Sequence, residues 1–338
     1  MAFRELIYQG RALSALDNYL ERLGEERAKA DQVATVIAEN PGLEIPLPDF
    51  PARAWDRMAA DKGVPGGRAY SPRLSGDGQP VPNVTLKVPT GGGKTYLACA
   101  ALSRIFGRYI SANVGMVLWI VPNEAIYTQT LKALRDRDHS YRQTLDRAAA
   151  GRVRILEKGD TLNRADLDAN LCVMVLMLQS SNRENQESLR LFRDRGDVHG
   201  FVPGEAEQDA HKALKEAVPN LSIYDLGDGG PAWPMVKSSM GNAMRVVRPV
   251  VVMDEGQRAV SDLAFRTLYD FNPAFVLELS ATPKDVAARP ARAGNPAIAG
   301  RSANILVEIS GRELESEGMI KMPMNVIPLH DTDWHSTL

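Results

Sequence analysis

Six short, predominantly apolar runs constrain the fold of this chain more than any other feature of its sequence. They lie at 84–88, 114–121, 153–156, 171–178, 250–253 and 275–279, and helical patterns separate several of them, as at 96–106 and 125–135. A strand that is apolar on both faces is typical of a parallel sheet covered by helices on both sides. The sequence therefore predicts an α/β fold with a mostly parallel sheet.

The segments before and between these apolar runs differ from them in composition and periodicity. Leucines recur at helical spacing between 13 and 23, so residues 1–40 are expected to form a helical segment. Residues 41–82 hold eight of the chain's 21 prolines, which predicts a surface connection in which no core forms. The polar stretch 181–248, with its glycine and proline clusters, is a predicted insertion that contains a helix at 211–217.

The composition is that of a globular protein with a sizeable core, since 44% of residues are hydrophobic and 24% charged. The net charge of −2 leaves any nucleic-acid contact to a local patch. Cys99 and Cys172 each lie inside an apolar run, which favours buried thiols over a disulfide or metal site. The N-terminus does not resemble a signal peptide, and no apolar run approaches the roughly 18 residues of a membrane helix. We therefore expect a cytoplasmic protein without membrane partners.

A glycine-rich turn, VPTGGGKT, connects the apolar run at 84–88 to the helical pattern at 96–106. Strand, loop and helix in this order are the setting of a phosphate-binding loop. Backbone N–H groups of the three glycines can approach phosphate oxygens because no Cβ stands in the way. Lys94 is then expected to reach the β- and γ-phosphates, and the Thr95 hydroxyl to bind Mg²⁺. The alternative is a flexible loop that happens to precede a helix.

A second signal is VVVMDEGQ, in which four apolar residues run directly into two carboxylates. A buried parallel strand that ends in Asp254 and Glu255 places both acids at the carboxyl edge of the sheet, where α/β folds bind ligands. We expect Asp254 to hold Mg²⁺ through water, and Glu255 to polarise the water that attacks the γ-phosphate. An acidic pair that starts a solvated loop is the alternative.

Two further strand ends carry polar residues. LELSATP ends in Ser280 and Thr282, whose hydroxyls are candidates to couple the acidic pair to a moving element. In WIVPNEAIYTQT a strand meets a helix, and Asn123, beside Pro122, is a candidate to bind a nucleic-acid phosphate with the helix N-terminus. Plain strand connections are the competing interpretation at both places.

Together these stretches resemble motifs I, Ia, II and III of a superfamily 2 helicase, in that order. The words VPTGGGKT, SSMGNAMRVVRPVVVMDEGQRAVSD and ISGRELESEGMIKMP narrow the resemblance to the restriction (Res) subunit of type III restriction–modification enzymes. That family typically has Asp-Glu-Gly-His at motif II, where this chain has Gln257, and Val88 replaces a glycine of the strict phosphate-loop pattern. The resemblance implies a RecA-like P-loop NTPase domain at 83–310 that binds ATP and Mg²⁺.

The resemblance also implies roles for single residues. Tyr8-Gln9 resembles the adenine-reading glutamine found upstream of motif I, with a solvated glutamine as the alternative for Gln9. Gln179 and Ser180 are expected to meet DNA backbone phosphate, as Asn123 does. The implied residues are Lys94, Asp254, Glu255 and Gln257 for catalysis; Gln9, Thr90, Gly91, Gly92, Gly93, Lys94 and Thr95 for the nucleotide; Thr95 and Asp254 for magnesium; Ser280 and Thr282 for coupling; Pro122, Asn123, Gln179 and Ser180 for DNA.

The implied function is an ATP-dependent translocase or helicase motor that moves on duplex DNA in a type III restriction-like anti-phage defence enzyme. Its implied partners are DNA, a methyltransferase or other defence-system subunit, and a second RecA-like domain with a nuclease region, in cis or in trans. The chain shows neither the arginine-bearing motifs of a second RecA-like domain nor a P-D…(D/E)-x-K nuclease pattern. Residues 311–338 are therefore expected to begin the passage to that second domain.

An alternative from another class is a nucleotide-binding interaction module of a defence complex, which does not move DNA. In that case ATP orders the insertion at 181–248 for a partner. ATPase activity measured with and without duplex DNA discriminates between the motor and the module.

Overall fold

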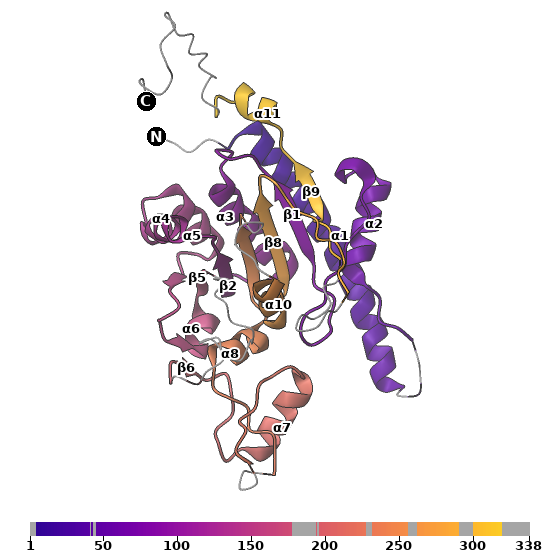
Figure 1. Cartoon of the computed structure of the whole chain (residues 1–338), viewed down its shortest axis with the longest axis vertical. Helices are drawn as coiled ribbons and strands as arrows, with labels where there is room; N and C mark the ends of the chain where they lie inside the picture. The colour runs from indigo at the N-terminus through magenta and orange to yellow at the C-terminus, as the bar shows by residue number, and fades with distance from the viewer. Residues whose placement is uncertain are drawn as a thin grey trace, which may run out of the picture.

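The computed structural model describes residues 5–40, 42, 45–177, 194, 196–227, 232–255, 262–290 and 300–319. Its main element is a seven-stranded sheet in the order β3-β5-β2-β7-β8-β1-β9, in which each neighbouring pair is parallel (Figure 1). The strands are β1 (Asn83–Lys87), β2 (Gly115–Ile120), β3 (Val153–Leu156), β5 (Leu171–Leu176), β7 (Val250–Asp254), β8 (Phe275–Ser280) and β9 (Ile305–Glu308). A second, parallel pair joins β4 (Leu162–Asn163) to β6 (Val198–His199).

All six apolar runs expected from the sequence form strands of this sheet, and the predicted RecA-like α/β fold is confirmed. Every residue of β5 and β7 is buried, because helices cover both faces. The seventh strand, β9, was not predicted. It adds four residues beside β1, with a register shift between Thr85 and Leu86.

Helices cover the sheet on both sides. Buried side chains of α1, α2, α3, α4 and α5 pack on one face, and those of α6, α8 and α10 pack on the other. The helices are α1 (Ile7–Glu39), α2 (Phe50–Ala60), α3 (Lys94–Arg104), α4 (Glu124–Arg135), α5 (Ser140–Ala148), α6 (Arg164–Ala169), α7 (Gln208–Ala217), α8 (Met240–Val247), α10 (Asp262–Asp270) and α11 (Gly311–Ser316). A short 3₁₀ turn spans Pro65–Gly67, and a π-helical segment, Ile105–Ile110, extends α3. No helix in the described ranges combines the length and apolarity needed to cross a membrane.

The proline-rich segment 41–82 contributes to the core, so the expectation that no core forms in it is wrong. It contains α2, which begins after the side-chain cap Asp49 and has Pro51 in its first turn. Proline is tolerated there because the first N–H groups of a helix have no partner within the helix. Trp55 of α2 is fully buried, packs edge-on against Tyr19 of α1, and donates its indole N–H to the carbonyl of Arg68.

Within the stretch predicted as an insertion, α7 lies at the end of the molecule opposite α11 (Figure 1). The helix expected at 211–217 is confirmed as α7. Residues at the end of the stretch form α8, which packs Met240, Ala243 and Met244 into the core on one face of the sheet. The thiols of Cys99 and Cys172 are free and buried, as the sequence predicted.

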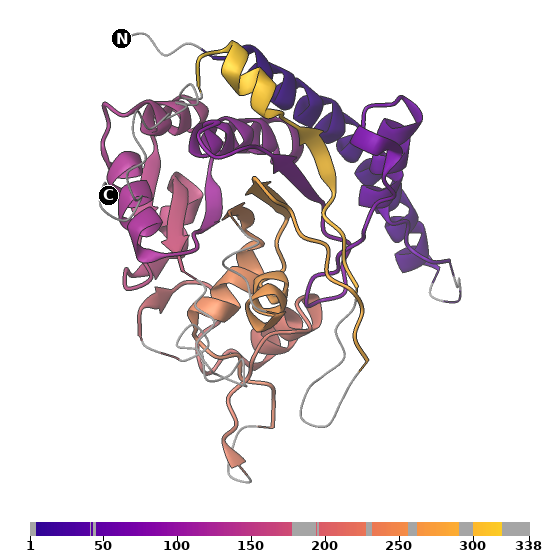
Figure 2. The ribbon, with the colours of Figure 1, turned by 45° about the horizontal axis from the view of Figure 1, so that its top comes forward.

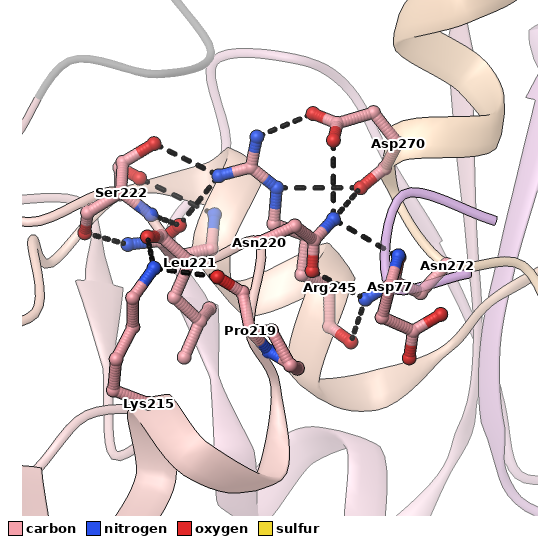
Figure 3. Close-up of polar contacts among 11 residues, drawn as sticks. Asp77, Lys215, Pro219, Asn220, Leu221, Ser222, Arg245, Asp270 and Asn272 are labelled. Carbon is pink, nitrogen blue, oxygen red and sulfur yellow. Dashed lines mark hydrogen bonds and ion pairs between the residues drawn. The ribbon is translucent and has the colours of Figure 1, made fainter. Parts of the chain in front are cut away.

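A buried polar network ties this stretch to the amino ends of the strands (Figure 3). The guanidinium of Arg245 on α8 forms an ion pair with Asp270 at the end of α10, and donates to the Ser222 hydroxyl at 2.8 Å. The amide of Asn220 donates to the Asp270 carbonyl at 2.9 Å and to the Asn272 side-chain oxygen at 3.0 Å. Because these groups satisfy one another, the segment around 220 is held firmly against the sheet.

Candidate functional site

A cleft of about 590 Å³ opens at the carboxyl edge of the sheet. Gly91, Gly93, Lys94 and Thr95 line it from the loop after β1, and Asp254 and Glu255 line it from the end of β7. The fold thus brings together two stretches that lie 161 residues apart, measured from Lys94 to Glu255.

The loop after β1 needs its glycines for different reasons. Gly91 and Gly93 have φ of 86° and 75°, in the left-handed region that side chains other than glycine rarely adopt. Gly92 has an ordinary φ, but a Cβ there would lie 2.7 Å from a methyl of Val88. Gly93 directly precedes α3, whose N-terminus has no side-chain cap. Backbone N–H groups of the first turn of α3 and the positive end of its helix dipole therefore face the cleft. Both favour the binding of an anion there.

Lys94 and Glu255 form an ion pair in this cleft, and their side chains are only 10% and 15% exposed. The neighbouring Asp254 is buried. The pKa of the Asp254 carboxyl is raised to about 6, mainly by burial; Lys94 opposes this rise and the neighbouring charge of Glu255 adds to it. Two acids thus share one lysine, and an added cation would relieve their repulsion.

The oxygen donors of the cleft fit a magnesium ion. The Thr95 hydroxyl and the Asp254 carboxylate line the same cavity, and Mg²⁺ binds through one or two protein oxygens with waters and substrate phosphates as its other ligands. Within the described ranges, no cluster of three or more His, Cys, Asp or Glu side chains forms a cage for a metal. Magnesium held in this way needs no such cage.

The end of β8 joins the phosphate loop to the acidic strand. The Ser280 carbonyl accepts a hydrogen bond from the N–H of Val88 at 2.9 Å, and the Leu279 carbonyl accepts one from the N–H of Glu255 at 2.9 Å. Ser280 is buried, and its hydroxyl oxygen accepts from the N–H of Thr282. The backbone at Ser280 thus links the strand ends that carry the phosphate loop and Glu255, while neither Ser280 nor Thr282 is among the residues that line the cleft.

The first turn of α1 braces the phosphate loop. The Tyr8 hydroxyl donates to the carbonyl of Gly92 at 3.1 Å. Gln9 is 3% exposed, so the alternative of a solvated glutamine is wrong. Its side-chain oxygen accepts from the N–H of Leu6, and its amide nitrogen lies 2.8 Å from where a Cβ of Gly93 would stand.

Of the four residues predicted to contact DNA, the structure describes two, Pro122 and Asn123. Asn123 is exposed, but its side-chain oxygen caps α4 by accepting from the N–H of Ile126 at 3.0 Å. Pro122 before it is half-buried, and Thr90 of the phosphate loop is exposed. The predictions for Gln257, Gln179 and Ser180 lie outside the described residues.

Several cleft residues were not predicted. Gln129 and Lys132 of α4, His139 and Tyr141 before and within α5, and Met319 after α11 also line the cavity. The rings of His139 and Tyr141 pack edge-on at 4.4 Å. Gln129 and Met319 lie within quoted motif stretches that gave no role to them, and Lys132, His139 and Tyr141 lie outside the motifs, so only the packing of α4, α5 and the C-terminal segment places all five at the cleft.

Comparisons with known proteins agree with the motif order. The family model described as "Type III restriction enzyme, res subunit" matches residues 75–285. No match was found among curated proteins. A solved structure, "Structure of a nuclease-deletion mutant of the Type ISP restriction-modification enzyme LlaGI in complex with a DNA substrate mimic", aligns with 81% of this chain at 11% identity. Its TM-score of 0.29 is too low to support an argument, and the alignment spans 21% of that longer chain.

Proposed function

Because this chain belongs to the family of type III restriction enzyme res subunits, we propose that it binds and hydrolyses Mg-ATP as the motor domain of a DNA translocase or helicase. The observation that carries the proposal is the convergence of Lys94, Asp254 and Glu255 on one cleft beside an uncapped helix N-terminus. A triphosphate needs this combination of backbone donors, one cation and acidic groups that hold a metal and a water.

In the proposed mechanism, Lys94 changes partner. The lysine is paired with Glu255, and the β- and γ-phosphates compete for the same ammonium group. Once the phosphates take the lysine, Lys94 no longer neutralises the Glu255 carboxylate, which then accepts a proton from the attacking water. Thr95 and Asp254 would hold Mg²⁺, which would supply positive charge against the charge that develops on the phosphates.

The positions of Tyr8 and Gln9 support a role for α1 in nucleotide binding. Gln9 is the residue proposed to read adenine, and it lies against the phosphate loop. Its oxygen accepts from the N–H of Leu6. An amide oxygen has a second lone pair and the amide nitrogen has two N–H groups, so the Gln9 side chain retains hydrogen-bonding capacity for an adenine.

Family membership supports the remaining proposals. These are movement on duplex DNA, a second RecA-like domain with a nuclease region, a methyltransferase or other defence-system subunit as partner, and anti-phage defence in the cytoplasm. Asn123 and Pro122 at the start of α4 are the described residues proposed to meet DNA phosphate.

The test is steady-state ATP hydrolysis by this chain together with a second RecA-like domain, with and without duplex DNA. We expect DNA to raise kcat and Glu255→Gln to remove the stimulated rate. Glu157→Gln is the matched control, because Glu157 is paired with Arg135 and Tyr127 and does not line the cleft. Hydrolysis that is indifferent to DNA would favour the interaction module instead.

A further inference from the structure

The residues that follow β9 lie against the phosphate loop. We call residues 309–319, which include α11, the strap. Figure 2 shows α11 alongside the first turns of α1, with β9 leading up to it. A capping box stabilises the start of α11, in which Ser310 and Glu313 exchange side-chain to backbone hydrogen bonds. The strap is therefore an ordered element.

The strap touches the loop at two points. Leu314 is fully buried, and one of its methyl groups lies 3.4 Å from where a Cβ of Gly92 would stand. The carbonyl oxygen of Met319 lies 3.8 Å from the corresponding position of Gly91, and Met319 lines the cleft. The strap thus lies next to two of the three glycines of the phosphate loop.

The strap is also tied to α1. Arg11 forms an ion pair with Glu313 at 2.5 Å and donates to the carbonyl of Glu308 at 3.1 Å. The N–H of Ile7 donates to the Glu317 carboxylate at 3.2 Å. Since Tyr8 of the same turn bonds to Gly92, the contacts close a ring of α1, phosphate loop and strap.

We propose that Arg11 and Glu313 are positioning residues that hold the strap against the phosphate loop and limit its motion. A loop of three successive glycines samples many conformations, and ordering it costs free energy when a ligand binds. A loop that α1 and the strap already support on both sides loses less conformational entropy when a ligand binds. The predicted effect on nucleotide affinity rests on the proposed ATP-binding function, whereas the predicted effect on loop motion does not.

The experiment measures hydrogen exchange of the amides at 90–97 in the protein without nucleotide. We expect Arg11→Ala to speed exchange there by up to about fivefold, the upper range for an exposed ion pair. Glu313→Gln should act in the same direction while its amide oxygen still caps α11. The double variant should exchange no faster than Arg11→Ala, because that substitution already removes the ion pair that Glu313→Gln removes.

Arg135→Ala provides a matched control. The Arg135–Glu157 pair is 2.6 Å long with side chains 49% and 38% exposed, against 48% and 36% for Arg11 and Glu313. The control should leave exchange at 90–97 unchanged. Unchanged exchange in Arg11→Ala and Glu313→Gln, or an equal change in the control, would overturn the proposal.

Calorimetric titration with Mg-ATP gives a second readout. We expect Arg11→Ala to weaken binding by up to about fivefold and the control to have no effect. If the wild-type protein binds no ATP, the proposed function fails, and the exchange experiment still decides whether the strap braces the loop.

Discussion

Lys94, Asp254 and Glu255 form an unbalanced group of charges. Two acids lie in a largely buried cleft with one lysine between them, and burial is the main cause of the raised pKa of Asp254. This arrangement lowers the stability of the folded protein, and it favours the binding of a metal cation at the site. Two predictions follow from these charges, one on stability and one on binding.

Asp254→Asn should stabilise the protein at high pH. The carboxyl pKa is raised from 3.8 to about 6 in the folded state, so folding is favoured most below pH 3.8 and the advantage is lost as pH rises through 6. Removing the charge should therefore raise the free energy of unfolding at pH 8 by about 1–3 kcal/mol. Urea unfolding at pH 8 and pH 4.5 measures this, and the gain should shrink at the lower pH.

Asp136→Asn is the control for this prediction, because Asp136 lines the same cleft but is exposed. It should change the free energy of unfolding by less than about 0.5 kcal/mol. A loss of stability in Asp254→Asn at pH 8 would show that the carboxylate is stabilised by its surroundings, contrary to its raised pKa.

Glu255→Gln should keep nucleotide binding and tighten it severalfold. The substitution removes the carboxylate that competes with phosphate for Lys94, and glutamine bears the same backbone cost at φ of 55°. With a second RecA-like domain present, turnover should fall by roughly two to four orders of magnitude, because the water loses its general base. Calorimetry and steady-state kinetics check the two parts. Loss of binding would mean that Glu255 supports the nucleotide directly.

At the scale of elements, the sequence predicted six strands because each of them is mostly apolar, and β5 is apolar along its whole length. It missed β9, whose four residues follow a loop without a motif. The proline content of 41–82 also obscured α2. Proline interrupts a helix in its interior, but Pro51 lies in the first turn of α2, where proline is tolerated. The ion pair between Arg11 and Glu313 spans 302 residues, and no local pattern could predict it.

Local sequence patterns were limited in the same way at the candidate site. The motifs located Lys94, Asp254 and Glu255 correctly at one sheet edge, since the carboxyl ends of parallel strands meet there. They did not predict the pairing of Lys94 with Glu255 or the burial of Gln9, because side-chain packing decides both.

The network around Arg245 should be an anchor for the segment that contains α7. Its ion pair with Asp270 has side chains only 6% and 19% exposed. Asp270→Ala leaves a buried guanidinium with fewer acceptors and should cost about 3–5 kcal/mol in the free energy of unfolding. Urea unfolding measures the loss, and hydrogen exchange at 208–222 should rise most.

Asp168→Ala serves as the comparison, since Asp168 pairs with Arg164 on the surface, with side chains 65% and 47% exposed. It should cost less than about 1 kcal/mol. Similar losses in the two variants would argue that the buried network does not anchor the segment.

At the scale of the whole molecule, we expect the proposed ATP site to bind the ground state better than the transition state. No arginine occurs among the cleft-lining side chains that the structure describes. In phosphoryl transfer an arginine finger is worth roughly 10³–10⁵ in rate. Residues 1–338 alone should therefore bind Mg-ATP but hydrolyse it far more slowly than about one per second, a rate within the usual enzyme range. Adding a second RecA-like domain, in cis or in trans, should restore DNA-stimulated turnover, and steady-state hydrolysis at that rate by this chain alone would contradict the account.

The central claim is that the glycine loop and Lys94 bind the phosphates of a nucleotide. Calorimetric titration of Mg-ATP into residues 1–338, compared with Lys94→Ala, tests it most directly. We predict saturable binding by the wild-type chain and a loss of about 10- to 100-fold in the variant, the range for a charged hydrogen bond. The melting temperature of the variant serves as a check that it is folded. Equal affinity of the two folded proteins for Mg-ATP would contradict the claim.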